Sequence, residues 1–395
     1  MCAKASNLLV DRASDFDQQL HMIRQAGRFA FDTEFVGEDR YKPELCLIQI
    51  ATETTQILID PLAGLDCRSF WELVADPSAE KIVHAGSEDL AICSQQIGRP
   101  AANVFDVQIA AGLIGLGYPT SLARLTRVMT GEKLHKSQTL TDWRARPLSD
   151  EQIDYAIEDV IHLPAIFAAA TRKLESLGRA SWVREECEAL CRTIAQQATG
   201  PVQVRRLKGM GTLTGRELTI AEALLDLRDQ LAREMDRPAR TVIRDHLLVE
   251  LARRGWTDPR RIASLRGLNL SQGAIKRVGE SVDRARALPA RENPNEVEAD
   301  TPQEEVVFSF LTAVLRDYCN ANEIAYSLLA TKDGLRELVR GIAHKTAVTP
   351  AVLRGWRGEA VGHLLDGLLR GALAVRVAHS SEGLRLQIEN DGQAP

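Results

Sequence analysis

The sequence predicts an α/β domain built on a β-sheet flanked by helices, followed by two mainly α-helical domains. Short β-rich runs alternate with helical patterns in the first third of the chain, and helical patterns dominate from about residue 150 onward. Two segments rich in helix breakers or prolines divide the helical part. A chain of 395 residues is also long enough for two to three domains of about 150 residues each.

The first predicted domain covers residues 1–200. Its β-rich runs are RFAFDTEF, LCLIQIA, QILIDPL and KIVHAG, and the helical pattern EDLAICSQQI follows the last of them. Runs of this length, rich in β-branched and aromatic residues, are typical of strands. Because RFAFDTEF is flanked by further apolar β-rich runs, we expect it to lie centrally in the sheet.

A second domain, residues 212–290, is predicted after the segment ATGPVQVRRLKGMGTLTG, which has helix breakers and no helical apolar stripe. Thr219 and Glu222 have the spacing of a capping box, and apolar residues follow at helical spacing. We therefore expect a helix to begin at Thr219 and a short helix bundle to follow.

A third domain, residues 303–395, is predicted after the stretch LPARENPNEVEADTP, whose prolines and acidic residues are typical of a linker. This domain is expected to be mainly helical. Its final part alternates apolar and polar residues around Ser-Ser-Glu-Gly, which predicts a terminal β-hairpin.

The composition, with 45% hydrophobic and 26% charged residues, is globular and excludes a disordered, collagen-like or coiled-coil chain. No run reaches about 18 apolar residues, and the N-terminus lacks the apolar core of a signal peptide, so we expect a cytoplasmic protein. The seven cysteines include no C-x-x-C pair and no spacing suited to zinc, which favours reduced, buried thiols.

The net charge of −5 is unevenly distributed along the chain. Residues 1–204 carry a balance of −8 and residues 287–395 a balance of −4, whereas residues 205–286 carry +7. A basic block within an acidic chain favours a polyanion partner, although an arginine-rich helical surface can also serve solubility alone.

Two acids in the first β-rich run are candidates for a metal site. The strand period of two places Asp32 and Glu34 on one face of FDTEF and the phenylalanines on the other. A lone Asp-x-Glu is usually the wet face of a half-exposed strand. On a central strand, however, two carboxylates repel each other and are poorly solvated, a cost that divalent cations remove by ligation.

Further acids follow in two other segments. Asp89 is expected in the first turn of the helix after KIVHAG, where complementing the helix dipole is the ordinary role of an acid. His84, at the strand end, is expected to be a hydrogen-bonded structural residue. In DYAIEDV, Tyr155 and Asp159 are four residues apart and share a helix face. Each feature alone is common, and it is their order along the chain that favours an active site.

Together, FDTEF, VHAGSEDL and DYAIEDV resemble the three motifs of the DEDD exonucleases in their tyrosine-bearing branch. The connecting segments RYKPELCLIQI, ILIDPL, FDVQIAA, LHKSQTLTDWRARPLS and HLPAIF resemble the ribonuclease D family within that branch. MDRPARTVIRDHLLVELARR resembles the helicase and RNase D C-terminal (HRDC) domain. SLLAT and LRGWRGEAVGHLLDGLLRG resemble a second, divergent HRDC domain.

The resemblance implies a ribonuclease H-like exonuclease domain with a mixed β-sheet flanked by helices, followed by two HRDC-like helical domains. It also implies two divalent metal ions, Mg²⁺ or Mn²⁺, as cofactors. Asp32, Glu34 and Asp159 would bind one ion, Asp32 would bridge to the second, and Asp89 would hold the second through water. Closely spaced cations require anionic ligands, which explains the need for four acids. Tyr155 would orient the attacking water, since a phenol with a pKa of about 10 suits positioning better than proton abstraction.

Residues around these acids are candidates for binding RNA. The substrate-binding set is Lys136, Gln49, His84, Trp143, Arg144 and Arg146. The three cationic residues are expected to contact phosphates. Trp143 is expected either to offer a stacking platform or to be packed against the helices, and Gln49 to point toward the terminal nucleotide. The basic patch of the HRDC-like domain is assigned to Arg228, Arg240, Arg244, Arg253 and Arg254.

The resulting hypothesis is a metal-dependent 3′ to 5′ exoribonuclease that acts as a monomer. It would trim RNA 3′ ends, tRNA precursors among them, and release nucleoside 5′-monophosphates. The alternatives are a DNA-directed exonuclease of the same chemistry and an RNA-binding scaffold that no longer cuts. The complete set of acids counts against the scaffold. The lack of a polymerase segment and of a G-x-x-x-x-G-K-[ST] loop counts against polymerase and helicase contexts.

Overall fold

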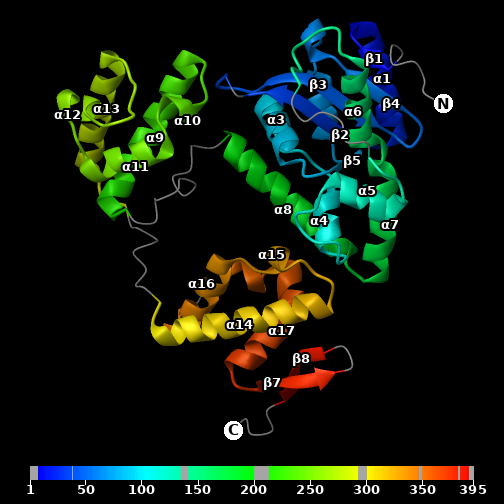
Figure 1. The fold of residues 1–395 in the computed structure, drawn as a ribbon, viewed down its shortest axis with the longest axis vertical. Coiled ribbons are helices and arrows are strands. Elements are labelled where there is room, and N and C mark those ends of the chain that lie inside the picture. The colour runs from blue at the N-terminus through cyan, green and yellow to red at the C-terminus, as the bar shows by residue number, and fades with distance from the viewer. Residues whose placement is uncertain are drawn as a thin grey trace.

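The computed structural model describes residues 8–37, 39–134, 141–199, 213–291, 300–346, 349–380 and 383–390. The chain folds into a six-stranded sheet unit with helices on both faces, followed by two groups of helices (Figure 1). The strands of the sheet are β1 (Leu9–Val10), β2 (Arg28–Val36), β3 (Glu44–Ala51), β4 (Gln56–Ile59), β5 (Glu80–Val83) and β6 (Val104–Asp106). The helices of this unit are α1 (Ala13–Ala26), α2 (Arg68–Val74), α3 (Ser87–Ile97), α4 (Val107–Gly112), α5 (Leu122–Thr130), α6 (Asp150–Ile161), α7 (Leu163–Ser176) and α8 (Ala180–Thr199).

The sheet is mixed, as predicted, with the strand order β1-β4-β3-β2-β5-β6. β2 pairs antiparallel with β3 and parallel with β5, so the strand that carries the Asp-x-Glu is central. Its side chains alternate: Phe29 and Phe31 are fully buried on the face covered by α1, α2 and α3. Asp32 and Glu34 point to the opposite face.

The middle group of helices comprises α9 (Gly215–Met235), α10 (Ala239–Val242), α11 (Asp245–Arg254), α12 (Pro259–Ala263) and α13 (Gln272–Ala287), and has its own apolar core. The predicted start of α9 at Thr219 is wrong. Thr214 and Glu217 form the capping box, with both reciprocal hydrogen bonds present. Thr219 is instead buried inside the helix, where its hydroxyl donates to the carbonyl of Gly215. Spacing alone could not choose between two Thr-x-x-Glu pairs.

The last part of the chain comprises α14 (Pro302–Ala321), α15 (Tyr326–Leu329), α16 (Lys332–Ala343) and α17 (Gly355–Leu369), and ends in the antiparallel pair β7 (Leu373–Ser380) and β8 (Gly383–Asn390). These helices share one apolar core with the sheet unit. Trp356 of α17 stacks on Trp182 of α8 with ring centroids 4.9 Å apart, and the Trp356 indole N–H donates to Glu186 at 2.7 Å. Arg357 makes two further contacts with the same Glu186 carboxylate. The α14–α17 unit therefore packs directly against the sheet unit and shares its apolar core.

Two expectations about the environment of the chain can be compared with the structure. The described helices include none that is both long and apolar enough to cross a lipid bilayer. The described cysteines are free and buried, in agreement with the predicted thiols; they are Cys46, Cys67, Cys93, Cys187, Cys191 and Cys319.

Candidate active site

Three carboxylates converge where α6 packs across β2, β3 and β4. Asp32 and Glu34 come from β2, and Asp159 comes from the last turn of α6. One carboxylate oxygen of each lies within 4.8 Å of the others, and all three residues are half-buried. The fold thus brings Asp159 beside two acids that lie more than a hundred residues earlier in the sequence.

Helix α6 is positioned by its first turn and by its inner face. Ser149 and Gln152 form a capping box that satisfies the first backbone N–H groups. Ile153, Ala156 and Val160 are buried against the sheet, which fixes the rotation of the helix. Tyr155 and Asp159, one turn apart, therefore lie along the edge of the buried face, beside the acids of β2.

The electrostatics of this cluster are unfavourable without a cation. Burial raises the pKa of Asp32 well above its usual value, and the neighbouring carboxylates of Asp89, Asp159 and Glu34 raise it further. Burial and the same repulsion raise the pKa of Glu34 to about 8, and burial raises the pKa of Asp159 to about 7. An all-oxygen, all-anionic ligand set under mutual repulsion fits hard divalent cations, which would remove both the repulsion and the desolvation penalty.

Asp89 lies beside the three acids but outside their closest grouping. Its Oδ1 accepts a hydrogen bond from the Thr33 hydroxyl at 2.5 Å. Burial raises the pKa of Asp89 to about 6, although the bond from Thr33 counteracts part of this rise. Thr33, the residue between the two acids of β2, thus fixes one oxygen of Asp89. Sequence analysis missed this role of Thr33, because a threonine in a strand ordinarily reports only β propensity.

Tyr155 borders the acid cluster with a half-buried side chain. Burial raises the pKa of its phenol to about 12, and the charges of Asp159, Glu34 and Asp32 contribute. The hydroxyl therefore remains protonated near neutral pH and can donate a hydrogen bond. A small pocket beside it is lined by Thr141, Trp143, Ser149, Glu151, Gln152 and Tyr155.

Comparisons with known proteins show to which protein family this fold and this site belong. The family model of a 3′-5′ exonuclease matches residues 9–175, and that of the HRDC domain matches residues 217–282. The curated ribonuclease D of Bartonella henselae is 30% identical over 377 residues, which cover 92% of this chain and 90% of that protein. The chain belongs to the ribonuclease D family. The resemblance inferred from the three motifs is confirmed, as is the prediction of an enzyme.

Two further members of the ribonuclease D family support the assignment over nearly the whole chain. The ribonuclease D of Shewanella sp. is 32% identical over 352 residues, covering 87% of this chain and 89% of that protein. The crystal structure of Escherichia coli RNase D, described as an exoribonuclease involved in structured RNA processing, matches with a TM-score of 0.79 and 29% identity. That match covers 92% of this chain and 98% of the other, so the predicted fold class is confirmed.

Within this ribonuclease D fold, Asp106 organises the turn that leads to Asp89. Its carboxylate accepts hydrogen bonds from the backbone N–H groups of Ala85, at 3.1 Å, and Gly86, at 3.3 Å, and it also caps α4 through Gln108. Ala85 has a positive φ of 55°, an uncommon conformation for a residue with a side chain. Asp106 therefore holds a strained turn in place. The Asp before a helix was the sequence signal that could have indicated this cap.

Two further substrate contacts were predicted, for His84 and for Lys136. The His84 ring is half-buried, and its Nε2 shares a hydrogen bond with the carbonyl of Thr120 at 2.9 Å, which fits the structural role expected for it. A contact between His84 and substrate stays a prediction. Lys136 lies outside the described residues, so its phosphate contact also stays a prediction.

The phosphate role predicted for Arg146 is wrong. Its Nε and Nη2 donate to the two carboxylate oxygens of Asp60 at 2.6 and 2.7 Å. Its remaining N–H groups donate to the carbonyls of Cys46, Trp143 and Ala145. All five N–H groups of the guanidinium are thereby used within the protein. Arg146 anchors the segment before α6 to β3 and to the end of β4.

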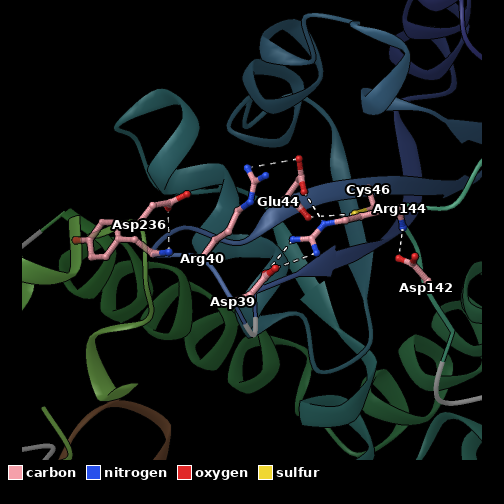
Figure 2. Close-up of polar contacts among 8 residues, drawn as sticks. Asp39, Arg40, Glu44, Cys46, Asp142, Arg144 and Asp236 are labelled. Carbon is pink, nitrogen blue, oxygen red and sulfur yellow. Dashed lines mark hydrogen bonds and ion pairs between the residues drawn. The ribbon is translucent and has the colours of Figure 1, made fainter. Parts of the chain in front are cut away.

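Arg144 lies in an ion-pair network at the surface (Figure 2). Its Nε donates to Glu44 at 2.7 Å and its Nη2 donates to Asp39 at 3.0 Å, while Arg40 lies 3.7 Å from the same Glu44. Two carboxylates thus balance its charge, and they would compete with any phosphate. A phosphate contact of Arg144 remains a prediction.

Two other expected substrate contacts are contradicted by burial. Trp143 is 8% exposed and packs against Tyr155, with ring centroids 6.0 Å apart, in a cluster with Leu47 and Leu58. It cannot offer a face to a base, and the structure supports the packed alternative. Gln49 is fully buried, so the prediction that it points toward the terminal nucleotide is wrong.

Of the five arginines predicted to form a basic patch on the HRDC domain, four are exposed and one is buried. Arg240, Arg244, Arg253 and Arg254 are exposed. Arg228 is 6% exposed and donates to Asp245 at 2.6 Å and to the carbonyl of Ile243 at 3.1 Å, so it ties α9 to α11 and cannot bind nucleic acid. The helical spacing of α9 places Arg228 on the same face as the apolar residues, and this spacing could have indicated that Arg228 is buried.

The loop between β2 and β3 also contacts the middle group of helices. The Tyr41 hydroxyl donates to Asp229 at 2.7 Å and accepts from Arg233 at 2.8 Å. The Tyr41 backbone N–H donates to Asp236 at 3.2 Å. Since the same loop carries Asp39, it links α9 to Arg144 and so to the segment before α6.

Proposed function

We propose that this member of the ribonuclease D family, a 3′ to 5′ exoribonuclease, trims RNA 3′ ends, tRNA precursors among them, and releases nucleoside 5′-monophosphates with the aid of two divalent ions. The observation that carries the proposal is the convergence of Asp32, Glu34 and Asp159, with Asp89 held beside them by Thr33. Mg²⁺ or Mn²⁺ suits such a set of oxygen ligands.

The acids and the tyrosine of the site have separate roles in this proposal. When bound, the two ions would stabilise the negative charge that develops on the phosphate and on the leaving 3′-oxygen. Asp32, Glu34 and Asp159 would be direct ligands, and Asp89 would act through water. The Tyr155 hydroxyl would donate a hydrogen bond that orients the attacking water, because a phenol with a pKa of about 12 keeps its proton.

The body of the RNA would be held by the HRDC domain. Support comes from the exposed arginines of α10 and α11 and from the +7 balance of residues 205–286. In this proposal residues 1–200 form the exonuclease domain, residues 212–290 the nucleic-acid-binding domain and residues 303–395 a divergent second HRDC-like domain. We further propose a cytoplasmic monomer, since buried free thiols suit a reducing compartment.

A cleavage assay on matched RNA and DNA oligonucleotides tests the proposal. Labelled RNA with a 3′-hydroxyl should shorten stepwise in Mg²⁺ and stay intact in chelator, whereas RNA with a 3′-phosphate should resist. Tyr155→Phe should slow the single-turnover rate while leaving RNA affinity similar. Faster degradation of the DNA would favour the DNA-directed alternative, and binding without cleavage would favour the scaffold. Cleavage inside the 3′-blocked strand would indicate an endonuclease.

A further inference from the structure

Gln49 is an unusual residue in the core of the sheet unit. Its side chain is fully buried, and neither its amide nitrogen nor its amide oxygen has a hydrogen-bond partner. Among the described residues it is the one side chain for which both polar atoms are left in this state. A buried amide without partners destabilises the fold, whereas an apolar side chain of similar shape would pack there without this penalty.

The position of Gln49 relates it to the acid cluster. On β3 it lies directly opposite Asp32 of β2, and on its other side it lies opposite Leu58 of β4. Side chains directly opposite on antiparallel strands share one face, with Cβ atoms about 4.5 to 5.5 Å apart. Gln49 and Asp32 therefore point to the same face of the sheet, beneath α6.

The Asp32 carboxylate needs hydrogen-bond donors when it is ionised. An ionised carboxylate accepts hydrogen bonds at both oxygens, and the backbone N–H of Thr33 is one neighbouring donor. The Gln49 amide, on its two-carbon stem, faces Asp32 from the directly opposite position of the neighbouring strand and is the nearest cross-strand side chain with an N–H to offer. The partners that orient a metal-ligating carboxylate are typically of this kind.

We propose that Gln49 is a positioning residue for Asp32: when Asp32 is ionised and ligates a metal, the Gln49 amide N–H donates to its carboxylate and fixes the oxygen that ligates the metal. The inference rests on the proposed metal-dependent function. Gln49 cannot contact the substrate, because it has no exposed surface. Its effect is exerted through Asp32, and the destabilising burial of its amide is offset when Asp32 is charged and ligated.

Direct titration of the protein with Mn²⁺ alone, followed by calorimetry, tests this role. Gln49→Met keeps the length of the side chain and removes the amide, so we expect Mn²⁺ affinity to fall about 10- to 100-fold. The melting temperature of the metal-free variant should stay level or rise, because an unpaired buried amide has been removed. Weaker metal binding in a protein of equal or higher stability is a combination that a merely structural glutamine would not give.

Leu58→Met is the matched control, because it changes the same buried face on the side of Gln49 away from Asp32. Its Mn²⁺ affinity should remain within twofold of the original chain. Gln49→Asn is a second test variant: it keeps the amide on a shorter stem, and we expect it to weaken Mn²⁺ binding as well. If Gln49→Met does not fold, Gln49→Asn alone decides.

The outcomes separate the inference from the function on which it rests. If the unchanged chain and Asp32→Asn bind Mn²⁺ equally, the metal site itself is wrong. If the unchanged chain binds Mn²⁺ and Asp32→Asn does not, the metal site stands. The positioning role of Gln49 is then overturned by a folded Gln49→Met or Gln49→Asn variant that binds Mn²⁺ within twofold of the unchanged chain.

Discussion

Arg146→Met is predicted to destabilise the protein strongly although the residue touches none of the four acids. The substitution removes both charged hydrogen bonds to Asp60, whose side chain is 6% exposed. Asp60 would keep the backbone N–H of Leu62 as a donor but would lose its cation. Removal of one partner from a buried ion pair typically costs about 3 to 5 kcal/mol. Because Arg146 is itself 25% exposed, we expect a loss of about 3 kcal/mol, at the low end of that range.

Equilibrium unfolding in urea, monitored by circular dichroism, measures this loss, and two further variants sharpen it. Arg144→Met is the matched control, because its partners Asp39 and Glu44 remain accessible to water and its loss should be much smaller. Combining Arg146→Met with Asp60→Leu should recover part of the stability, since no buried charge is then left unpaired. If Arg146→Met costs no more than Arg144→Met, the buried-pair reasoning is refuted.

Three further predictions concern the metal site and the RNA. Asp159→Asn should abolish hydrolysis and raise the melting temperature of the metal-free protein, because one of the mutually repelling carboxylates is removed; normal turnover at an unchanged melting temperature would exclude Asp159 from the site. In chelator, the stability of the unchanged chain should fall as the pH rises from about 4 to about 8, because the pKa values of Asp159 and Glu34, raised to about 7 and about 8, make the folded chain bind more protons than the unfolded chain over this range. Thermal unfolding from about pH 4 to about pH 8 should show this fall, which levels off once both carboxylates are ionised, and saturating Mg²⁺ should reduce it; stability that rises with pH over this range in chelator would contradict the assignment. Replacing the exposed arginines of the HRDC domain by glutamine should lower the slope of log RNA affinity against log salt by about 0.7 to 0.9 for each phosphate that is no longer neutralised, with hydrolysis of a short oligonucleotide retained. An unchanged slope would mean that these arginines serve solubility; they are Arg240, Arg244, Arg253 and Arg254.

Those parts of the site that depend on local periodicity could be predicted from the sequence. The period of a strand places Asp32 and Glu34 on one face, and the period of a helix places Tyr155 and Asp159 on one face. Both statements hold wherever the strand and the helix lie in the fold. The order of the motifs along the chain then indicated the family, and the family resemblance predicted that the acids of the strand and of the helix lie together in one site.

Those parts that depend on distant partners could not be predicted. Arg146 is 86 residues from Asp60, and nothing local distinguishes an arginine that binds a carboxylate in the core from one that binds a phosphate. Gln49 lies in an apolar strand, where its polarity favoured a functional contact, yet its burial follows from the packing of α6 over the sheet. The shared core of the last helices was likewise hidden, because a linker-like segment precedes them in the sequence.

That shared core has a consequence for how the protein is made. The surface of α8 around Trp182 receives its partner, Trp356 of α17, only after the ribosome has added the roughly 170 residues between the ends of the two helices. At about 5 to 20 residues per second, this takes roughly 10 to 30 seconds. During that interval the nascent catalytic half presents an uncovered apolar surface of the kind that makes folding intermediates prone to aggregate, while the intervening HRDC bundle can fold on its own core. Messages truncated before α17 would leave that surface uncovered permanently.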